Sequence, residues 1–239
     1  SLHLIECCVE ASVGLFVFSS SAAVYGNPAK IPVHEEAPTD PINPYGRTKL
    51  ITEWTLKDFA ERTGSNLPLR YVALRYFNVA GASLDGALGQ ATPEATHLIK
   101  VACEAACGKR DSVSIFGTDY DTKDGTCIRD YIHVEDLAAA HLGALDYLAT
   151  GGTSAVLNCG YGHGYSVREV LDMVRKVSGN DFSIQETGRR EGDPACLISD
   201  NRSIRELLTW APQHNDLELI CATAFQWERA KQGPKSRKG

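Results

Sequence analysis

The 239-residue sequence lacks the marks of several common classes of protein. It has no Cys-x-x-Cys pair, and its seven histidines do not group with its eight cysteines, so neither a zinc site nor a disulfide framework is expected. No apolar run approaches the roughly 18 residues of a membrane span, and no signal peptide is recognisable. With a net charge of −6, the folded body has no general attraction for nucleic acid. These absences favour a globular, cytoplasmic protein with reduced and buried thiols.

Helical and strand patterns alternate along the chain, which predicts an α/β fold with a mostly parallel sheet. The clearest helix signal is Ser166, an N-cap residue with Glu169 three positions later and Gly179 beyond the helix end. The one basic cluster, KQGPKSRKG, contains glycine, proline and serine and indicates a frayed C-terminal tail. We expect helices over 2–12, 45–62, 94–107, 135–149, 166–178, 201–209 and 216–230, and strands over 16–20, 71–77, 112–117 and 155–160.

Three polar or glycine-rich segments follow predicted strands: SSSAAVYG, FNVAGAS and CGYGHGYS. The carboxyl ends of parallel strands meet at one edge of a sheet, so we expect one crevice to gather all three segments. The last segment resembles a dinucleotide loop only superficially, because its spacing is G-x-G-x-G and no acidic residue follows at the right distance on a second strand. We therefore predict a sharp turn into the helix at 166–178.

The stretch PINPYGRTKL places Tyr45 and Lys49 four residues apart, one turn of a predicted helix. A tyrosine hydroxyl has a reference pKa near 10, so it is a poor base at neutral pH. A lysine ammonium within about 4–6 Å favours the phenolate, as would a positively charged nicotinamide ring. Lowering the tyrosine pKa by roughly three units needs about 4 kcal/mol, which two cations in a partly dry cleft can supply. By itself the pair also fits an ordinary exposed helix.

The serine-rich run before this pair adds a third group. Ser21 or its neighbours follow a buried strand, where a hydroxyl can pass a proton between a substrate oxygen and the tyrosine. The alternative interpretation is a turn in which Ser19 and Ser20 satisfy backbone groups at the strand end.

Five motifs occur in a fixed order along nearly the whole chain, to about Trp227: SSSAAVYG, NPYGRTKL, LRYFNVAGA, GTCIRDYIHVEDLAAAH and GRREGDPA. Together they resemble the UDP-glucose (UDP-galactose) 4-epimerases of the extended short-chain dehydrogenase/reductase family. Tyr-x-x-x-Lys is shared across that superfamily, whereas RDYIHV with RREGD is specific to members that bind nucleotide sugars. The resemblance implies an NAD-dependent isomerase that interconverts UDP-glucose and UDP-galactose through a 4-keto sugar. It also implies a homodimer packed through the tyrosine-bearing helix and the helix before it.

The resemblance assigns roles at the reacting end of the site. It implies that Tyr45 is the base at the sugar 4-hydroxyl, that Lys49 holds the nicotinamide ribose and lowers the pKa of the tyrosine, and that Ser21 bridges the sugar O4 and the tyrosine. Tyr76 and Phe77 would lie along the nicotinamide of the cofactor NAD.

The remaining roles that the resemblance implies concern the UDP-sugar substrate. Asn78 would touch the nucleotide sugar, His97 and Leu98 would contact the sugar and diphosphate, and Ser114 and Phe116 would line the uracil pocket.

The diphosphate and uridine ribose would be held by charged residues. Arg129 and Arg190 would clamp the diphosphate, and Asp193 would accept the ribose hydroxyls. Two arginines suit this task, since guanidinium binds phosphate bidentately. From the residues alone, each arginine could equally form a surface ion pair.

Departures from related patterns bear on the reaction and on the sugar. The related 4,6-dehydratases carry an Asp-Glu pair where this chain has Ala22 and Ala23, so epimerisation is favoured over dehydration. Leu197 aligns beside the sugar C2 substituent and is intermediate in size. A 4-epimerase of UDP-N-acetylhexosamine or UDP-pentose therefore stays open, as does a non-catalytic nucleotide-binding member. Lys100 stands where the family usually has proline, and we expect it at a solvated helix position.

The chain has no G-x-G-x-x-G loop before Tyr45, although the family holds its dinucleotide there. Comparison with the family predicts that roughly a hundred residues of the first βαβαβ half are missing, and that the chain alone is an inactive fragment. The remainder would comprise a Rossmann-like doubly wound parallel sheet, a smaller nucleotide-sugar-binding α/β domain and a flexible tail. Their expected bounds are 1–77 with about 132–161, 78–131 with about 162–232, and 233–239.

Overall fold

The computed structural model describes residues 1–62 and 69–231, which form two compact units. The first unit comprises 1–77, 137–163 and 197–212, and the second comprises 78–136, 164–196 and the chain from 213 onward. The segment 197–212, which the resemblance places in the sugar-binding domain, thus belongs to the first unit. The predicted tail over 233–239 lies outside the described residues. In the part of the chain that is described, no helix is long and apolar enough to cross a membrane.

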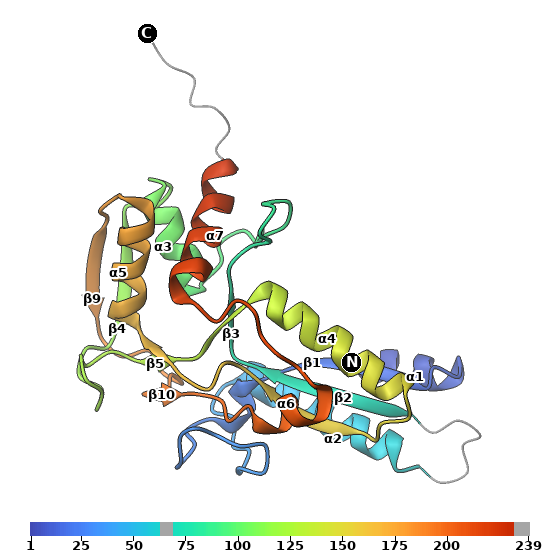
Figure 1. Ribbon diagram of the computed structural model, residues 1–239. Helices are drawn as coiled ribbons and strands as arrows, with labels where there is room; N and C mark the ends of the chain where they lie inside the picture. The colour runs from blue at the N-terminus through green and yellow to red at the C-terminus, as the bar shows by residue number, and fades with distance from the viewer. Residues whose placement is uncertain (63–68, 232–239) are drawn as a thin grey trace. The chain divides into compact units, whose positions relative to one another are not determined.

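The first unit is built on a parallel three-stranded sheet in the order β1-β2-β7 (Figure 1). Its central strand is buried along most of its length because helices and neighbouring strands cover it. The parallel α/β class is therefore confirmed. The elements of this unit are α1 (Leu2–Glu10), β1 (Leu15–Ser21), the 3₁₀ helix η1 (Ala22–Tyr25), α2 (Pro44–Ala60), β2 (Arg70–Tyr76), most of α4 (Val134–Ala149), β7 (Ala155–Cys159) and α6 (Arg202–Leu208).

The second unit packs three helices against one another, α3, α5 and α7, which lie side by side in Figure 1. Strands β4 and β9 form a parallel pair beside them, and β3 pairs in parallel with β6. A small sheet has the order β10-β5-β8. The elements are β3 (Asn78–Ala80), α3 (Leu98–Ala106), β4 (Ser112–Phe116), β5 (Ile128–Arg129), β6 (Tyr131–His133), β8 (Tyr165–Ser166), α5 (Val167–Ser178), β9 (Ser183–Thr187), β10 (Cys196–Leu197) and α7 (Leu217–Ala230).

The predicted capping signals of α5 are present. Ser166 and Glu169 form a reciprocal capping box, and Gly179 ends the helix with φ +66°. The helix expected over 94–107 is shorter than predicted, because α3 begins only at Leu98 and ends at Ala106. The prediction also omits several short strands, such as β3 and β6, because two or three residues are too few to show a periodic pattern.

Candidate functional site

The predicted serine, tyrosine and lysine all lie in the first unit. Ser21 ends β1, and its hydroxyl accepts a hydrogen bond of 3.2 Å from the Ala23 backbone N–H. Tyr45 is the second residue of α2, a helix that begins there because Pro44 occupies its first turn and Asn43 caps it by accepting from the Gly46 N–H at 2.8 Å. Tyr45 is 52% exposed, so the residue is open to solvent.

Lys49 is held one turn further along α2. Its Nζ donates to the Ser19 carbonyl at 2.8 Å and lies 5.5 Å from the centre of the Tyr45 ring. Burial lowers the pKa of Lys49 below its ordinary value. A partly desolvated ammonium beside the tyrosine is the arrangement that favours a phenolate.

Tyr76 ends β2 directly beside Ser21, because the two residues are register partners in the parallel sheet. Burial raises the pKa of Tyr76, and the nearby Tyr45 raises it further. His141, which the sequence analysis does not single out, donates through Nδ1 to the Leu137 carbonyl at 2.9 Å. Its Nε2 therefore accepts from the Ser19 hydroxyl at 3.0 Å, and its ring lies 6.5 Å from the Tyr76 ring.

Two other predicted site residues of this unit are buried in its core. Phe77 and Leu197 pack in one cluster with Ala22, Val24 and Tyr25. The cluster thus includes three of the residues that directly follow β1. In the described structure, both side chains are therefore packed in the core, and little of either is exposed to a ligand.

A buried polar network lies beneath the strand ends. The Arg75 guanidinium donates three hydrogen bonds of 2.6–3.2 Å to the Glu53 carboxylate, and Ser20 donates to the same carboxylate. Arg75 also donates to the Tyr25 hydroxyl at 2.9 Å, which in turn donates to Asn158 at 2.7 Å. Burial raises the pKa of Tyr25 to about 12, so this hydroxyl stays neutral. The network joins β1, α2, β2 and β7 and fixes the elements that carry Ser21, Tyr45 and Lys49.

In the second unit, three predicted substrate residues line one cavity of about 40 Å³: Asn78, His97 and Leu98. Asn78 is the register partner of Tyr131, which lines the same cavity. His97 is the exposed N-cap residue of α3, but its side chain does not cap the helix. Gln90, Trp227 and Glu228 also line the cavity, and none of the three lies in a motif that would have marked it in the sequence.

The other four predicted residues of this unit that carry a charge or an aromatic ring occur as two pairs. The Arg190 guanidinium lies 4.0 Å from the centre of the Phe116 ring, and Arg129 lies 3.7 Å from the Asp193 carboxylate. Ser114 is on β4, two residues before Phe116. The structure therefore pairs Arg190 with Phe116 and Arg129 with Asp193. Arg190, which is exposed, has the more accessible guanidinium.

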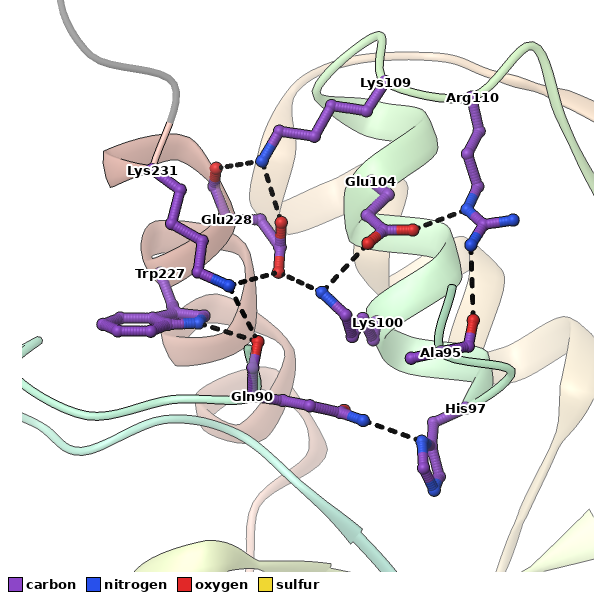
Figure 2. A network of polar contacts seen from close by, with 10 residues as sticks. All are labelled: Gln90, Ala95, His97, Lys100, Glu104, Lys109, Arg110, Trp227, Glu228 and Lys231. Carbon is purple, nitrogen blue, oxygen red and sulfur yellow. Dashed lines mark hydrogen bonds and ion pairs between the residues drawn. The ribbon is translucent and has the colours of Figure 1, made fainter. Parts of the chain in front are cut away.

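The expectation for Lys100 is wrong. Its side chain is not solvated: the residue is only 7% exposed and forms ion pairs with Glu104 at 2.9 Å and Glu228 at 2.5 Å. Figure 2 shows this network, in which Lys109 also reaches Glu228 at 2.8 Å. The spacing of Lys100 and Glu104 at i, i+4 on a helix predicts their ion pair, but it does not predict that Lys100 is buried.

Among residues 1–62 and 69–231, one group of side chains could hold a metal ion. Donor atoms of His133, Glu135 and His214 all lie within 4.8 Å of one another. The Glu135 backbone N–H already donates to His133 Nδ1 at 3.2 Å, and His133 Nε2 lies 3.3 Å from the Thr223 hydroxyl. A metal would have to displace one of these contacts, so a structural role for the buried histidine fits better. None of the eight cysteines, all of which lie in the described part of the chain, forms a disulfide.

Comparisons with known proteins agree with the motifs. Residues 1–160 match the NAD dependent epimerase/dehydratase family. The chain is 55% identical to a UDP-glucose 4-epimerase of Azospirillum brasilense, over 96% of this chain and 65% of that protein. It is 56% identical to the solved UDP-Glc/GlcNAc 4-epimerase of Campylobacter jejuni, with a TM-score of 0.78, and 95% of this chain and 68% of that chain are covered.

A third similarity is to the UDP-glucose 4-epimerase of Bifidobacterium longum, solved in complex with NAD⁺ and UDP. The identity is 36% and the TM-score 0.88, over 96% of this chain and 68% of that one. The chain belongs to the NAD-dependent epimerase/dehydratase family, within the extended short-chain dehydrogenases/reductases. It spans about two thirds of the length of these relatives.

Proposed function

We propose that the protein interconverts UDP-glucose and UDP-galactose by oxidation and reduction at the sugar C4 through a 4-keto intermediate. The observation that carries the proposal is the arrangement of Ser21, Tyr45 and Lys49 at the end of β1 and on the first turns of α2. The epimerases named above align with 95% or more of this chain at 36–56% identity, and they support the reaction type.

The residues of the first unit suit the nicotinamide end of NAD, which supplies hydride acceptance and return when bound. Lys49 offers an ammonium beside the exposed Tyr45, and Tyr76 offers an aromatic face at the neighbouring strand end. Tyr45 takes the proton of the sugar 4-hydroxyl while the hydride on carbon C4 is removed. Ser21 orients that hydroxyl, and Lys49 stabilises the phenolate. When the ketone is reduced on its other face, Tyr45 returns the proton to the oxygen.

In the second unit, we propose that Asn78, His97 and Leu98 contact the nucleotide sugar. Arg129 and Arg190 would bind its diphosphate, and their cationic forks are suited to phosphate oxygens. Ser114 and Phe116 would contact the uracil, and Asp193 the ribose. These roles rest on the resemblance.

A coupled assay of UDP-galactose conversion tests the reaction. It uses protein expressed from the complete coding sequence. Tyr45→Phe should lower kcat by at least about 10²-fold, since it removes the general base. Tyr147→Phe is the matched control, because Tyr147 lies on α4 with its hydroxyl 3.3 Å from Thr153. Normal turnover by Tyr45→Phe would exclude this base.

The substrate range is a separate question. Leu197 is buried beside Phe77 and does not by itself select a sugar. The name of the Campylobacter relative includes both UDP-Glc and UDP-GlcNAc, so UDP-N-acetylhexosamines and UDP-pentoses belong in the same assay. Turnover of an N-acetylated sugar but not of UDP-galactose would replace the first proposal. Failure with every sugar, together with retained nucleotide binding, would indicate a non-catalytic member.

Three narrower proposals accompany the reaction. A homodimer is supported by Ile51 and Trp54, which are more than half exposed on α2, and light scattering tests it.

Residues 1–239 alone should bind NAD too weakly for activity, because their sequence has no G-x-G-x-x-G loop to hold the pyrophosphate; turnover by this segment alone would refute that. A cytoplasmic location stays a prediction, which fractionation of cells would test.

A further inference from the structure

Gln90 and His97 meet at the cavity of the second unit. The side-chain amide nitrogen of Gln90 lies 2.8 Å from Nδ1 of His97 (Figure 2). We infer that Gln90 is a positioning residue that holds His97 as the neutral tautomer with its proton on Nε2, so that His97 offers a hydrogen-bond donor to an oxygen of the nucleotide sugar. The part that concerns the nucleotide sugar rests on the proposed function.

The tautomer follows from what each atom can do. An amide nitrogen donates hydrogen bonds and does not accept them, so His97 Nδ1 must be the acceptor and must carry no proton. A neutral imidazole then carries its single proton on Nε2. Among the described residues, no protein partner occupies His97 Nε2, and the residue is exposed. The N–H is therefore available to a ligand.

The backbone of Gln90 is itself held by residues at the end of α7. Its backbone carbonyl oxygen accepts two hydrogen bonds of 3.0 Å, one from the Trp227 indole N–H and one from the Lys231 ammonium. The preceding Gly89 packs directly on the indole, where an added Cβ would lie 2.5 Å from the ring. A side chain at position 89 would push this segment away. The close approach thus fixes the backbone from which the Gln90 amide extends.

The buried charges tie α7 to the helix that carries His97. Glu228 follows Trp227 on α7 and pairs with Lys100, three residues after His97 on the first turn of α3. Gln90 contacts Trp227, and the helix that carries His97 is paired with Glu228. The two residues are consequently both anchored to the same end of α7. This common anchoring explains how a side-chain contact between a loop and a helix N-terminus can keep one geometry (Figure 2).

A donor at Nε2 suits the ligand chemistry of the proposed function. Phosphate oxygens and sugar hydroxyls both accept hydrogen bonds, and a phosphate oxygen only accepts. The opposite tautomer would present a lone pair to that oxygen and repel it. Loss of one hydrogen bond to a charged group weakens binding by about 10-fold.

The test reads the tautomer without a substrate. Protein expressed from the complete coding sequence is labelled with ¹⁵N in its histidines, and the His97 signals are assigned by their loss in His97→Gln. In the unaltered protein, Nδ1 should show the shift of an unprotonated nitrogen and Nε2 that of a protonated one. Gln90→Met, which has similar volume but no donor, should give a mixture of both tautomers. Gln226→Met, an exposed substitution on α7, should leave the spectrum unchanged.

Binding of UDP to the same proteins, measured by calorimetry, gives the second readout. We expect Gln90→Met to weaken UDP or to raise the KM for the UDP-sugar up to about 10-fold, with a smaller change in kcat. A protonated Nδ1 in the unaltered protein, or an unchanged tautomer in Gln90→Met, overturns the inference. A changed tautomer with unchanged UDP affinity and KM overturns its link to the nucleotide sugar. Normal tautomer behaviour with no turnover of any UDP-sugar overturns the proposed function alone.

Discussion

The two units bury charge in different ways. In the first unit, Arg75 places its planar guanidinium against one carboxylate, Glu53, through three hydrogen bonds. In the second unit, the Lys100 ammonium sits between two carboxylates, Glu104 and Glu228. Arg75, Glu53, Lys100 and Glu228 are all buried, but Lys100 and Glu228 also line the cavity of the second unit.

The difference follows from the two cations. A guanidinium is a rigid fork that matches one carboxylate, while an ammonium is a point charge that can be shared among several. The Arg75 charge is therefore balanced by one carboxylate, whereas the Lys100 charge is balanced by two. The Arg75–Glu53 pair suits a fixed framework beneath Ser21, Tyr45 and Lys49. The Lys100 group suits a cavity wall, where the loss of one carboxylate leaves another in place.

The largest effect on stability is expected from removing Glu53, the carboxylate that pairs with Arg75. Glu53→Leu leaves the Arg75 charge buried without its carboxylate and should lower the free energy of unfolding by about 3–5 kcal/mol. Hydrogen exchange should rise in peptides from β1 and β2 and change little in α7.

A double variant serves as the control for that experiment. Glu53→Leu combined with Arg75→Met removes both charges, and an apolar pair of similar volume is often no less stable than the ion pair. The double variant should recover most of the loss. A double variant as unstable as Glu53→Leu would show that packing, and not the unpaired charge, sets the stability here.

A smaller effect is expected in the shared network. Glu228→Gln keeps the shape but removes one of the two charges around Lys100, and Glu104 remains at 2.9 Å. The loss should be about 1–3 kcal/mol, with faster hydrogen exchange confined to α3 and α7. Glu218→Gln is the matched control on α7: it breaks an exposed pair with Lys176, which should be worth about 0–1 kcal/mol. Equal losses in Glu228→Gln and Glu53→Leu would remove the distinction between the networks.

This contrast also marks what the sequence could and could not predict. Tyr45 and Lys49 were predictable because they are local: one turn of α2 places them together whatever surrounds the helix. The α/β class and the capping box of α5 were predictable for the same reason. Lys100 was not, because its burial depends on Glu228, 128 residues away on a helix whose partner no local pattern reveals.

Arg75 presents the same difficulty. In the strand pattern YVALRYF it reads as a polar interruption, yet it is buried because Glu53 and Tyr25 converge on it from α2 and η1. Gln90 and Trp227 carry no motif at all. Long-range pairing, and not local preference, decides the polar interior and the wall of the cavity.

The smallest effect on stability is expected from acidification. Here pH, and not a substitution, is used to weaken the second unit. Burial raises the pKa of Glu228, but hydrogen bonds from Lys100 and Lys109 outweigh it, so the pKa lies below its ordinary value. Burial likewise raises the pKa of Glu104, and hydrogen bonds from Arg110 and Lys100 reverse the shift. A carboxylate with a lowered folded-state pKa stabilises the fold above its unfolded-state pKa of about 4.3.

That stability is lost as the pH falls through the lowered folded-state pKa, so acidification below about pH 4.3 should weaken the second unit. Hydrogen exchange in α3 and α7, corrected for the intrinsic pH dependence of exchange, should show less protection at about pH 3.5 than at about pH 6. Glu228→Gln should reduce this change, because one of the two titrating groups is gone, whereas Glu218→Gln should retain it. An identical acid response in Glu228→Gln would mean that Glu104 and other carboxylates carry the whole effect, and that Lys100 does not share its charge between two partners.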